Sequence, residues 1–216
     1  MQLYNSFGPN PRAMRMFLAE KKLTIPFKDV DIMKAENRQA AYNARNPGGQ
    51  LPALELDNGH CLGETVAIWD YLEEKYPLPP LIGETPEERA ETHQWQRRVE
   101  LNITENIYNG FRFAEGLEMF RNRLPCEPEA APGLKRIAQT RLKWLDGLID
   151  GRDYIVPNRF TIADLILYCC LDFAGGVGQT LDPSLSNLEN WFKRIGNRPS
   201  AQASLHSTAA KVRMKG

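Results

Sequence analysis

Strand-like and helix-like segments alternate along the first third of the chain, and only helical patterns follow. Strands are expected at residues 1–6, 27–32, 51–56 and 60–62, and helices at residues 12–23, 35–46 and 65–76. The turn Asp57-Asn58-Gly59 separates the last two strands, and its Asn-Gly pair supplies the positive φ angles that a hairpin turn needs. The order β-α-β-α-β-β-α therefore predicts an α/β domain over residues 1–77.

A proline-rich segment, LPPLIGE, separates this domain from the helical remainder. We expect a linker over residues 78–85 and an all-α domain, a helical bundle, over residues 86–216. Thr85 and Glu88 have the spacing of a capping box, and Pro86 suits the first helical position. The predicted fold class is therefore α/β plus all-α.

Three further helical patterns lie in the second domain. The helix that begins at Pro86 is expected to run to about residue 124, with breaks or bends at Gly110 and Gly116. Residues 134–150 place their apolar side chains on one face. Thr161 and Asp164 form a second capping box before LILYCCL, which is apolar nearly all round and predicts the central buried helix.

The composition excludes several classes of protein. Lys and Arg together number 27, as do Asp and Glu, which argues against a nucleic-acid or anionic-membrane partner. No apolar run reaches the ~18 residues of a membrane-spanning helix, and MQLYNSFG has no signal-peptide pattern. Cys61, Cys126, Cys169 and Cys170 show neither disulfide-framework nor metal-site spacing. We expect a cytoplasmic protein without a metal.

Four segments together resemble the cytosolic glutathione transferases. They are NPGGQLPALELDNG, LGETVAIWDYLEEKYP, DYIVPNRFTIADLILY and LENWFKRIGNRPS, in this order. The resemblance covers essentially the whole chain. It implies a thioredoxin-like domain followed by a helical domain, glutathione as co-substrate, and a homodimer in which the helix containing ERAETHQWQRRVELN packs against its twin.

The resemblance gives a reason for Pro52, which cannot donate to a sheet ladder. In the family the proline at this position follows a cis peptide bond. The backbone of Leu51 is then implied to pair with the cysteinyl unit of glutathione, like an added strand. The alternative is an edge-strand proline without a ligand.

Three further residues are implied to hold the ends of glutathione. The helix expected at residues 65–76 offers free N–H groups at its N-terminus, which suit the γ-glutamyl α-carboxylate, and Thr65 adds a hydroxyl. Glu64 suits the ammonium group, and Gln50 suits the glycyl carboxylate. The alternatives are that Thr65 only caps its helix and that Gln50 is a solvated loop residue.

The loop SFGPNPR is implied to activate the glutathione thiol. Aligned through RAMRM, Gly8 stands at the serine of the serine-type classes and Asn10 at the cysteine of the cysteine-type class. Asn10 resembles the asparagine of some bacterial and fungal members, and Ser6 is the second catalytic candidate. Tyr4 roughly matches the tyrosine of the tyrosine-type classes. The alternatives are a helix N-cap for Asn10, with Pro11 as first helical residue, loop hydrogen bonding for Ser6 and strand packing for Tyr4.

The second substrate is expected between the domains. Candidate wall residues are Tyr108, Phe111, Arg112, Phe113 and Tyr168, although an aromatic stripe at helical spacing is also typical of a core. Arg112 is an arginine among aromatic residues and could hold an anionic substrate.

Three functions remain open from the sequence. The first is transfer of an alkyl or aryl group to glutathione, with a small electrophile as partner. The second is glutathione-dependent reduction of a disulfide or a peroxide, and the third is glutathione binding without catalysis. Gly8 and the missing serine favour the second and third, whereas Pro52, Glu64 and Thr65 favour binding of glutathione in all three.

Overall fold

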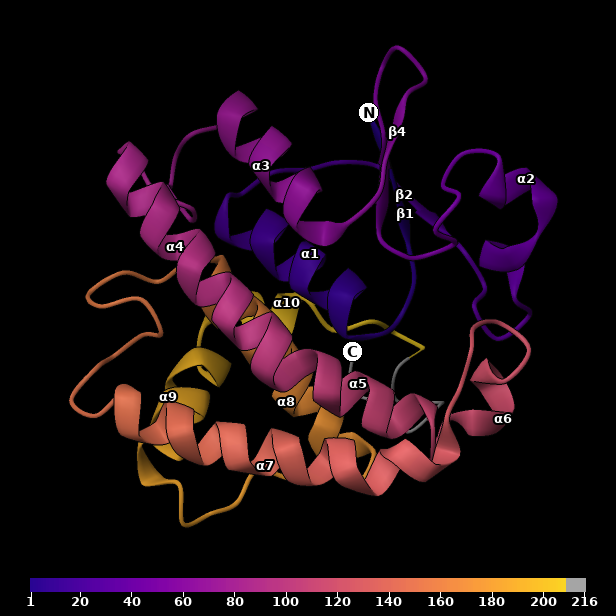
Figure 1. Ribbon diagram of the computed structural model, residues 1–216. Helices are drawn as coiled ribbons and strands as arrows, with labels where there is room; N and C mark the ends of the chain where they lie inside the picture. Colours follow the sequence, from indigo (N-terminus) through magenta and orange to yellow (C-terminus); the bar gives the residue numbers. More distant parts are fainter. Residues whose placement is uncertain (209–216) are drawn as a thin grey trace.

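The computed structural model describes residues 1–208 and contains a mixed β-sheet followed by a group of helices (Figure 1). The strands are β1 (Gln2–Asn5), β2 (Phe27–Asp29), β3 (Ala53–Glu55) and β4 (Cys61–Leu62). Their order in the sheet is β2-β1-β3-β4, with β1 and β2 parallel and the other neighbours antiparallel. The predicted fold class, a thioredoxin-like α/β domain followed by an all-α domain, is confirmed.

Two helices of the α/β domain lie beside each other, α1 (Pro9–Glu20) and α3 (Thr65–Lys75) (Figure 1). The rings of Phe17 on α1 and Trp69 on α3 are stacked with their centroids 5.5 Å apart, and both side chains are fully buried. Because α1 also packs against a long helix of the second domain, its N-terminus lies where the two domains meet.

The start of α1 differs from the sequence prediction. The pattern predicts Asn10 as the N-cap and Pro11 as the first helical residue, but the helix begins at Pro9. Gly8 occupies the cap position with a φ of 122°, a conformation that residues with a Cβ rarely adopt. The prediction is wrong because Pro9 also suits the first helical position and Gly8 supplies the turn before it. Asn10 is therefore a side chain of the first turn.

The helix predicted at residues 35–46 is broken into a 3₁₀ turn, η1 (Glu36–Arg38), and a short helix, α2 (Ala40–Asn43). Asn37 explains part of the break, because its Nδ2 donates to the C=O of Gly49 at 2.6 Å. Such bonds from side chain to backbone compete with helix formation.

The second domain is helical throughout. Its elements are α4 (Pro86–Val99), the π-helical segment η2 (Glu100–Thr104), α5 (Glu105–Arg112), α6 (Leu117–Phe120), the 3₁₀ turn η3 (Pro128–Ala130), α7 (Ala131–Leu148), α8 (Ile162–Gly176), α9 (Ser186–Gly196) and α10 (Pro199–Ala203). Thr85 caps α4, since its Oγ1 accepts the N–H of Glu88 at 3.2 Å. Of the two glycines expected to interrupt the long helix, Gly110 lies inside α5 and Gly116 lies in the turn before α6.

Helix α8 is the central buried helix, as predicted, and its capping box is present. Thr161 Oγ1 accepts the N–H of Ala163, and Asp164 accepts the N–H of Thr161. The carboxylate of Asp164 is fully buried and also accepts from the N–H of Ile155 at 2.9 Å and from Trp191 Nε1 at 2.8 Å. One side chain therefore joins the start of α8 to the preceding loop and to α9.

Two buried arginines on α1 connect the domains. Arg12 forms an ion pair with Asp172 on α8, and its guanidinium lies 5.3 Å from the ring centroid of Tyr168. Arg15 Nε donates to the C=O of Ser204 at 2.7 Å. These contacts hold α1 against α8 and the segment after α10, and so fix the position of the first turn of α1.

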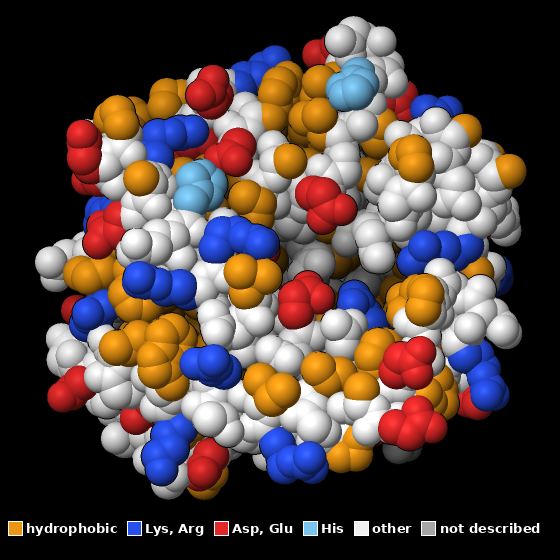
Figure 2. All heavy atoms as spheres, viewed as in Figure 1, with side chains coloured by type: hydrophobic (Ala, Val, Ile, Leu, Met, Phe, Trp, Pro, Cys, Tyr) orange, Lys and Arg blue, Asp and Glu red, His pale blue; other side chains and the backbone are white. Residues whose placement is uncertain are grey.

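Charged side chains of both signs are interspersed over the face shown in Figure 2. The same face is hollowed between the start of α3 and the continuous helix of α4, η2 and α5, with acidic side chains beside the hollow. Within residues 1–208, no helix has the length and the hydropathy needed to cross a membrane.

Candidate active site

Two cavities lie between the α/β domain and the helical domain, and Asn10 and Tyr108 line both of them. The aromatic cavity is the one that these two residues share with Leu51, Phe111, Arg112 and Phe173. The polar cavity is the one that they share with Glu64, Thr65, Gln96 and Glu100. The Asn10–Tyr108 pair therefore stands between a mainly apolar space and a polar one.

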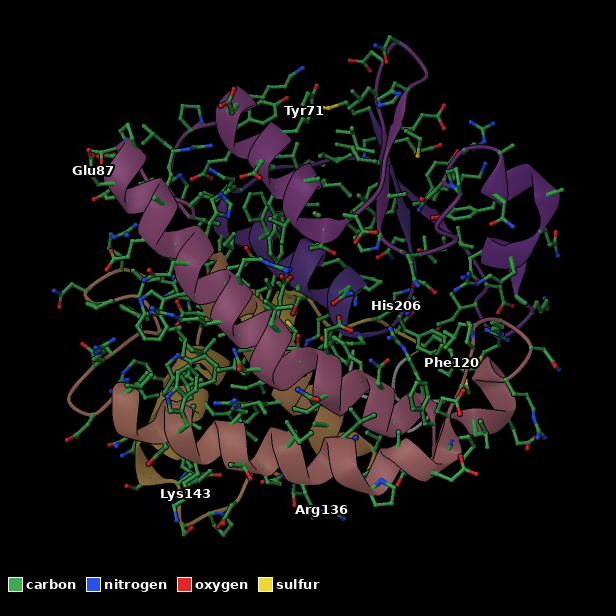
Figure 3. The ribbon with its side chains drawn as sticks, in the orientation of Figure 1. Tyr71, Glu87, Phe120, Arg136, Lys143 and His206 are labelled. Atoms are coloured by element: carbon green, nitrogen blue, oxygen red, sulfur yellow. The ribbon has the colours of Figure 1, made fainter. Side chains whose placement is uncertain are left out.

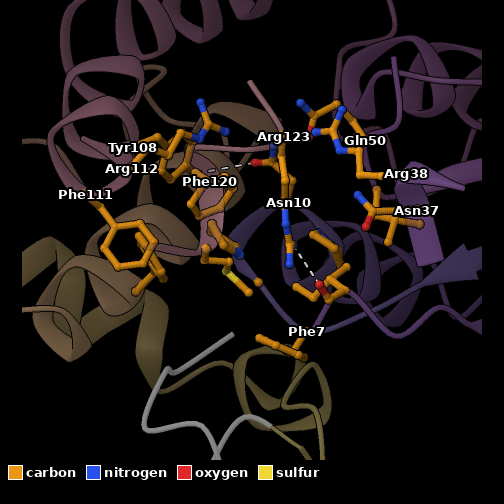
Figure 4. Close-up of a pocket in the computed structure, with 17 residues that line it drawn as sticks. Phe7, Asn10, Asn37, Arg38, Gln50, Tyr108, Phe111, Arg112, Phe120 and Arg123 are labelled. Atoms are coloured by element: carbon orange, nitrogen blue, oxygen red, sulfur yellow. Dashed lines mark hydrogen bonds between the residues drawn. The ribbon is translucent and has the colours of Figure 1, made fainter. Parts of the chain in front are cut away.

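The walls of the aromatic cavity come from both domains. In Figure 4, Asn37, Arg38 and Gln50 of the α/β domain lie opposite Tyr108, Phe111, Arg112 and Phe120 of the helical domain, with Asn10 between the two groups. The ring of Phe111 packs edge to face on Phe173 and on Phe120, with centroid distances of 5.1 Å and 6.0 Å. Phe120 comes from α6 and is labelled in Figure 3.

Asn10 and Tyr108 are in direct contact. The Tyr108 hydroxyl donates to Asn10 Oδ1 at 3.4 Å. Burial raises the pKa of Tyr108 well above its ordinary value, so this hydroxyl stays protonated and remains a donor at neutral pH. Because Oδ1 is the acceptor in this contact, the Nδ2 group of Asn10 is the part of the amide that can donate to a ligand.

The Leu51–Pro52 peptide bond is cis, and Leu51 lines the aromatic cavity. The loop before it is held by Tyr42 and Asn46, whose Oη and Nδ2 both donate to the C=O of Gln50, at 2.7 Å and 2.9 Å. Among the described residues, neither the N–H nor the C=O of Leu51 has a hydrogen-bond partner. Both backbone groups of Leu51 are therefore able to pair with an extended ligand.

Glu64 and Thr65 stand at the start of α3 and line the polar cavity. Glu64 is the cap residue, with a φ of 62° that is unusual for a residue other than glycine, and its side chain makes no capping bond within residues 1–208. Thr65 is the first helical residue rather than the cap. The free N–H groups of this first turn and the Thr65 hydroxyl thus lie together at the cavity.

The α/β side of the aromatic cavity includes Asn37 and Arg38, which sequence reasoning missed, beside the predicted Gln50. Asn37 is buried, and its Oδ1 has no hydrogen-bond partner in the described part of the chain. The same holds for the buried Nε of Arg38. No local motif marks these two residues, since they reach the cavity through the contact of η1 with the loop at residues 48–50.

On the helical side, Tyr108, Phe111 and Arg112, three of the expected wall residues, line the aromatic cavity together with residues that the sequence did not indicate. These are Met119, Phe120, Arg123 and Phe173. Arg123 also bridges the domains, because its Nη1 donates to the C=O of Ile32 at 2.7 Å.

Ser6 and Tyr4 are placed away from both cavities. The Ser6 hydroxyl donates to the C=O of Val30 at 2.8 Å and is buried. The Tyr4 hydroxyl donates to Glu55 at 2.6 Å, and burial together with that carboxylate raises the pKa of Tyr4 to about 12. Each hydroxyl already has an acceptor in the α/β domain, so neither side chain is brought to Asn10.

Tyr168 and Phe113 also lie outside the cavities. The Tyr168 ring packs on Phe192 at a centroid distance of 5.1 Å and hydrogen-bonds to Arg12, so it belongs to the contact between α1, α8 and α9. Phe113 follows the last residue of α5 and does not share the face of Phe111. The structure corrects the expectation that these two aromatic residues line the substrate pocket.

The cysteines take no part in either cavity. Cys169 and Cys170 are buried in α8, as predicted, and burial raises the pKa of Cys169 to about 12. Cys61 and Cys126 are partly buried at other positions. Within residues 1–208, His, Cys, Asp and Glu form no group that could hold a metal ion.

Two family models match the chain. They describe the N-terminal domain of glutathione S-transferases, over residues 3–80, and the C-terminal domain of the same proteins, over residues 113–199.

Individual relatives agree with these models. The chain is 30% identical over 214 residues to glutathione S-transferase GstA of Escherichia coli O157:H7, covering 98% of this chain and 100% of the relative. It is 40% identical over 185 residues to a maleylacetoacetate isomerase of Pseudomonas aeruginosa, covering 84% and 85%. The crystal structure of Gtt2 from Saccharomyces cerevisiae superposes with a TM-score of 0.88 at 29% identity, covering 95% of this chain and all of that chain.

Proposed function

This chain belongs to the glutathione S-transferase family, and from that premise we propose that it binds glutathione across both cavities and activates its thiol for attack on a small electrophile. The observation that supports this most directly is the position of Asn10. Asn10 lines the polar cavity with Thr65 and the aromatic cavity with Leu51. A single ligand that extends from Thr65 to Leu51 would therefore pass the Asn10 side chain.

In this proposal the γ-glutamyl group of glutathione occupies the polar cavity. Its α-carboxylate accepts from the first-turn N–H groups of α3 and from the Thr65 hydroxyl, while Glu64 pairs with its ammonium. The cysteinyl unit pairs with the backbone of Leu51. The glycyl carboxylate then lies near Gln50 and Arg38, which face the aromatic cavity from the neighbouring loops.

Asn10 acts on the sulfur. A free thiol has a pKa of about 8.5 and is only slightly ionised at pH 7, so a donor that stabilises the thiolate increases the reactive fraction. The Nδ2 group of Asn10 is such a donor, and the N-terminus of α1 adds a favourable field. The thiolate attacks the electrophilic carbon, a new S–C bond forms, and the leaving group departs with its electron pair. The thiol proton passes to solvent.

A second candidate function is reduction of a mixed disulfide. It is favoured by the neutral character of Asn10, because a thiol with a pKa near ambient pH is close to optimal for disulfide exchange. All four cysteines lie outside the cavities, so both electrons would come from glutathione. A first glutathione thiolate attacks the substrate disulfide, breaks its S–S bond, and forms a new disulfide with one half while the other half leaves as a thiolate. A second glutathione thiolate attacks that disulfide, so that glutathione disulfide forms and the remaining half is released as a thiolate.

We also propose a homodimer in which α4 and η2 of two chains meet. Leu101 on η2 is a large exposed apolar residue, and α4 presents Glu and Arg side chains that allow a self-complementary contact. Light scattering should give twice the chain mass at micromolar concentration, and a monomer there would contradict the dimer.

One assay series tests the choice of reaction. Glutathione-dependent turnover is measured side by side with 1-chloro-2,4-dinitrobenzene, a hydroperoxide and a mixed disulfide, for the unmodified protein and for Asn10→Ala. We expect turnover of the aryl halide and its loss in the variant. Turnover of the disulfide alone would favour the second function. Glutathione binding without turnover of any of the three would leave a binding protein.

A further inference from the structure

The aromatic cavity carries an excess of positive charge. Arg38, Arg112 and Arg123 all line it, whereas no Asp or Glu among the described residues does so. Burial lowers the pKa of Arg38, and the charges of Arg123 and Arg112 lower it further, as expected for three guanidinium groups that lie close together.

Two acidic side chains between Arg112 and Arg123 in the sequence are already paired with other residues. Glu115 forms an ion pair with Lys135, and Glu118 forms one with Arg121. In the part of the chain that the structure describes, Arg38, Arg112 and Arg123 form no ion pair. Like charges brought together at a partly buried site are destabilising unless an anion offsets them.

Two of the three guanidinium groups, those of Arg112 and Arg123, are held in place by neutral partners. Arg112 lies over the rings of Tyr108 and Phe120, at 5.7 Å and 5.8 Å from their centroids, and its Nη1 donates to Asn109 at 3.0 Å. Arg123 donates to backbone carbonyls of the loop after β2. Each guanidinium has five N–H donors, so both keep donors for a ligand after these contacts are made.

We propose that the acceptor substrate is an organic anion: a small electrophile with an aromatic or unsaturated body and a carboxylate or similar oxyanion that Arg112 and Arg123 bind. The inference rests on the proposed function, in which the glycyl carboxylate of glutathione lies near Arg38 and offsets one of the three charges. Two positive charges then remain beside the rings of Phe111 and Phe120. This cavity therefore combines an apolar surface for the body of the substrate with paired donors for its oxyanion.

A matched pair of electrophiles tests this proposal. 4-Chloro-3,5-dinitrobenzoate and 4-chloro-3,5-dinitrobenzamide share the reacting carbon and differ in charge. We expect the unmodified protein to use the benzoate with a kcat/KM at least tenfold above that of the amide. Arg112→Gln should reduce this ratio toward one, and Arg123→Gln should reduce it several-fold. The control is Arg121→Gln, which removes an exposed arginine of the same segment outside the cavity and should keep the ratio.

A binding measurement separates the inference from the reaction. Calorimetry with glutathione present compares the unreactive 3,5-dinitrobenzoate with 3,5-dinitrobenzamide. We expect tighter binding of the benzoate, weakened about tenfold by Arg112→Gln. If neither electrophile is turned over but the benzoate still binds better, the proposed function fails and the anion site stands. The anion proposal is overturned if the protein does not prefer the benzoate over the amide in either assay. It is also overturned if Arg112→Gln and Arg123→Gln both retain the full preference for the benzoate.

Discussion

The two sides of the site differ in the groups that they present to a ligand. The α/β side presents backbone groups, the N–H and C=O of Leu51 and the first-turn N–H groups of α3, together with polar side chains such as those of Thr65 and Gln50. The helical side presents side chains, chiefly the rings of Tyr108 and Phe111 and the guanidinium of Arg112. Asn10 belongs to the first domain by sequence but contacts the second through Tyr108.

This difference has a consequence for substitution. Backbone groups keep their direction when a side chain changes, so part of the proposed glutathione half of the site depends on how the chain is folded and part on side chains such as that of Thr65. The acceptor half depends on which side chains α5, α6 and α8 carry. We therefore expect changes at the start of α3 to alter glutathione affinity, changes on the helical side of the aromatic cavity to alter acceptor preference, and changes at the Asn10–Tyr108 contact to alter turnover. The following predictions test that division, beginning with the largest effect.

The largest expected effect is on the stability of the whole protein, and it does not distinguish the two sides of the site. Asp164→Ala removes the acceptor of three buried donors, those of Thr161, Ile155 and Trp191. Because an unsatisfied buried donor costs about 1–3 kcal/mol, we expect a loss of about 3 kcal/mol or more in the free energy of unfolding. Thermal or denaturant unfolding measures it. Asp164→Asn keeps one acceptor oxygen, so its free energy of unfolding should lie between those of the unmodified protein and Asp164→Ala.

The matched control is Asp182→Ala, which removes an exposed aspartate that accepts the N–H of Ser184 at 2.9 Å. Its cost should stay near 1 kcal/mol or below, as for a surface cap. Equal losses for Asp164→Ala and Asp182→Ala would show that the buried network adds little.

The next effect should be confined to glutathione binding. Thr65→Ala removes a hydroxyl beside the first turn of α3, and we expect glutathione to bind about 1–3 kcal/mol more weakly, as for a lost bond to a charged group. Calorimetry measures the affinity, with Thr140→Ala on α7 as a control whose hydroxyl only bonds the backbone of its own helix. Unchanged affinity in Thr65→Ala would remove the γ-glutamyl group from this position.

Asn10→Ala should act on turnover rather than on binding. We expect a kcat at least about tenfold lower, equivalent to about 1.4 kcal/mol, with the glutathione dissociation constant within a few fold, because the contact matters most when the sulfur is charged. Ser6→Ala serves as the comparison and should keep kcat in whatever remains folded. The reverse result, with Ser6→Ala inactive and Asn10→Ala active, would mean that Ser6 activates the thiol.

The smallest effect is expected at the contact that links the two sides. Tyr108→Phe removes the hydroxyl that donates to Asn10 over 3.4 Å, which is long for such a bond. We expect kcat to fall about two- to fourfold with glutathione affinity unchanged. A fall as large as that of Asn10→Ala would indicate that Tyr108 itself contacts the sulfur.

The positions of the residues in the proposed glutathione half of the site follow largely from short segments of the sequence. Pro52 lies between a Gly-Gly pair and a strand, and Glu64 and Thr65 precede a clear helical pattern, so their neighbours in sequence are also their neighbours in space. The capping box of Thr161 and Asp164 is local in the same way. The start of α1 was harder to predict because Pro9 and Pro11 both suit a first helical position.

By itself the sequence determined the order of strands and helices, the capped ends of α4 and α8, and the residues beside the start of α3. The tertiary structure alone decided which side chains face the aromatic cavity. Tyr168 and Phe173 lie on the same helix, but five residues rotate a side chain by about 140° around the axis, and it is Phe173 that faces the aromatic cavity. Arg38, Arg112 and Arg123 likewise line one cavity although they come from η1, α5 and the segment after α6, and no local pattern specifies a contact between segments so far apart in the chain.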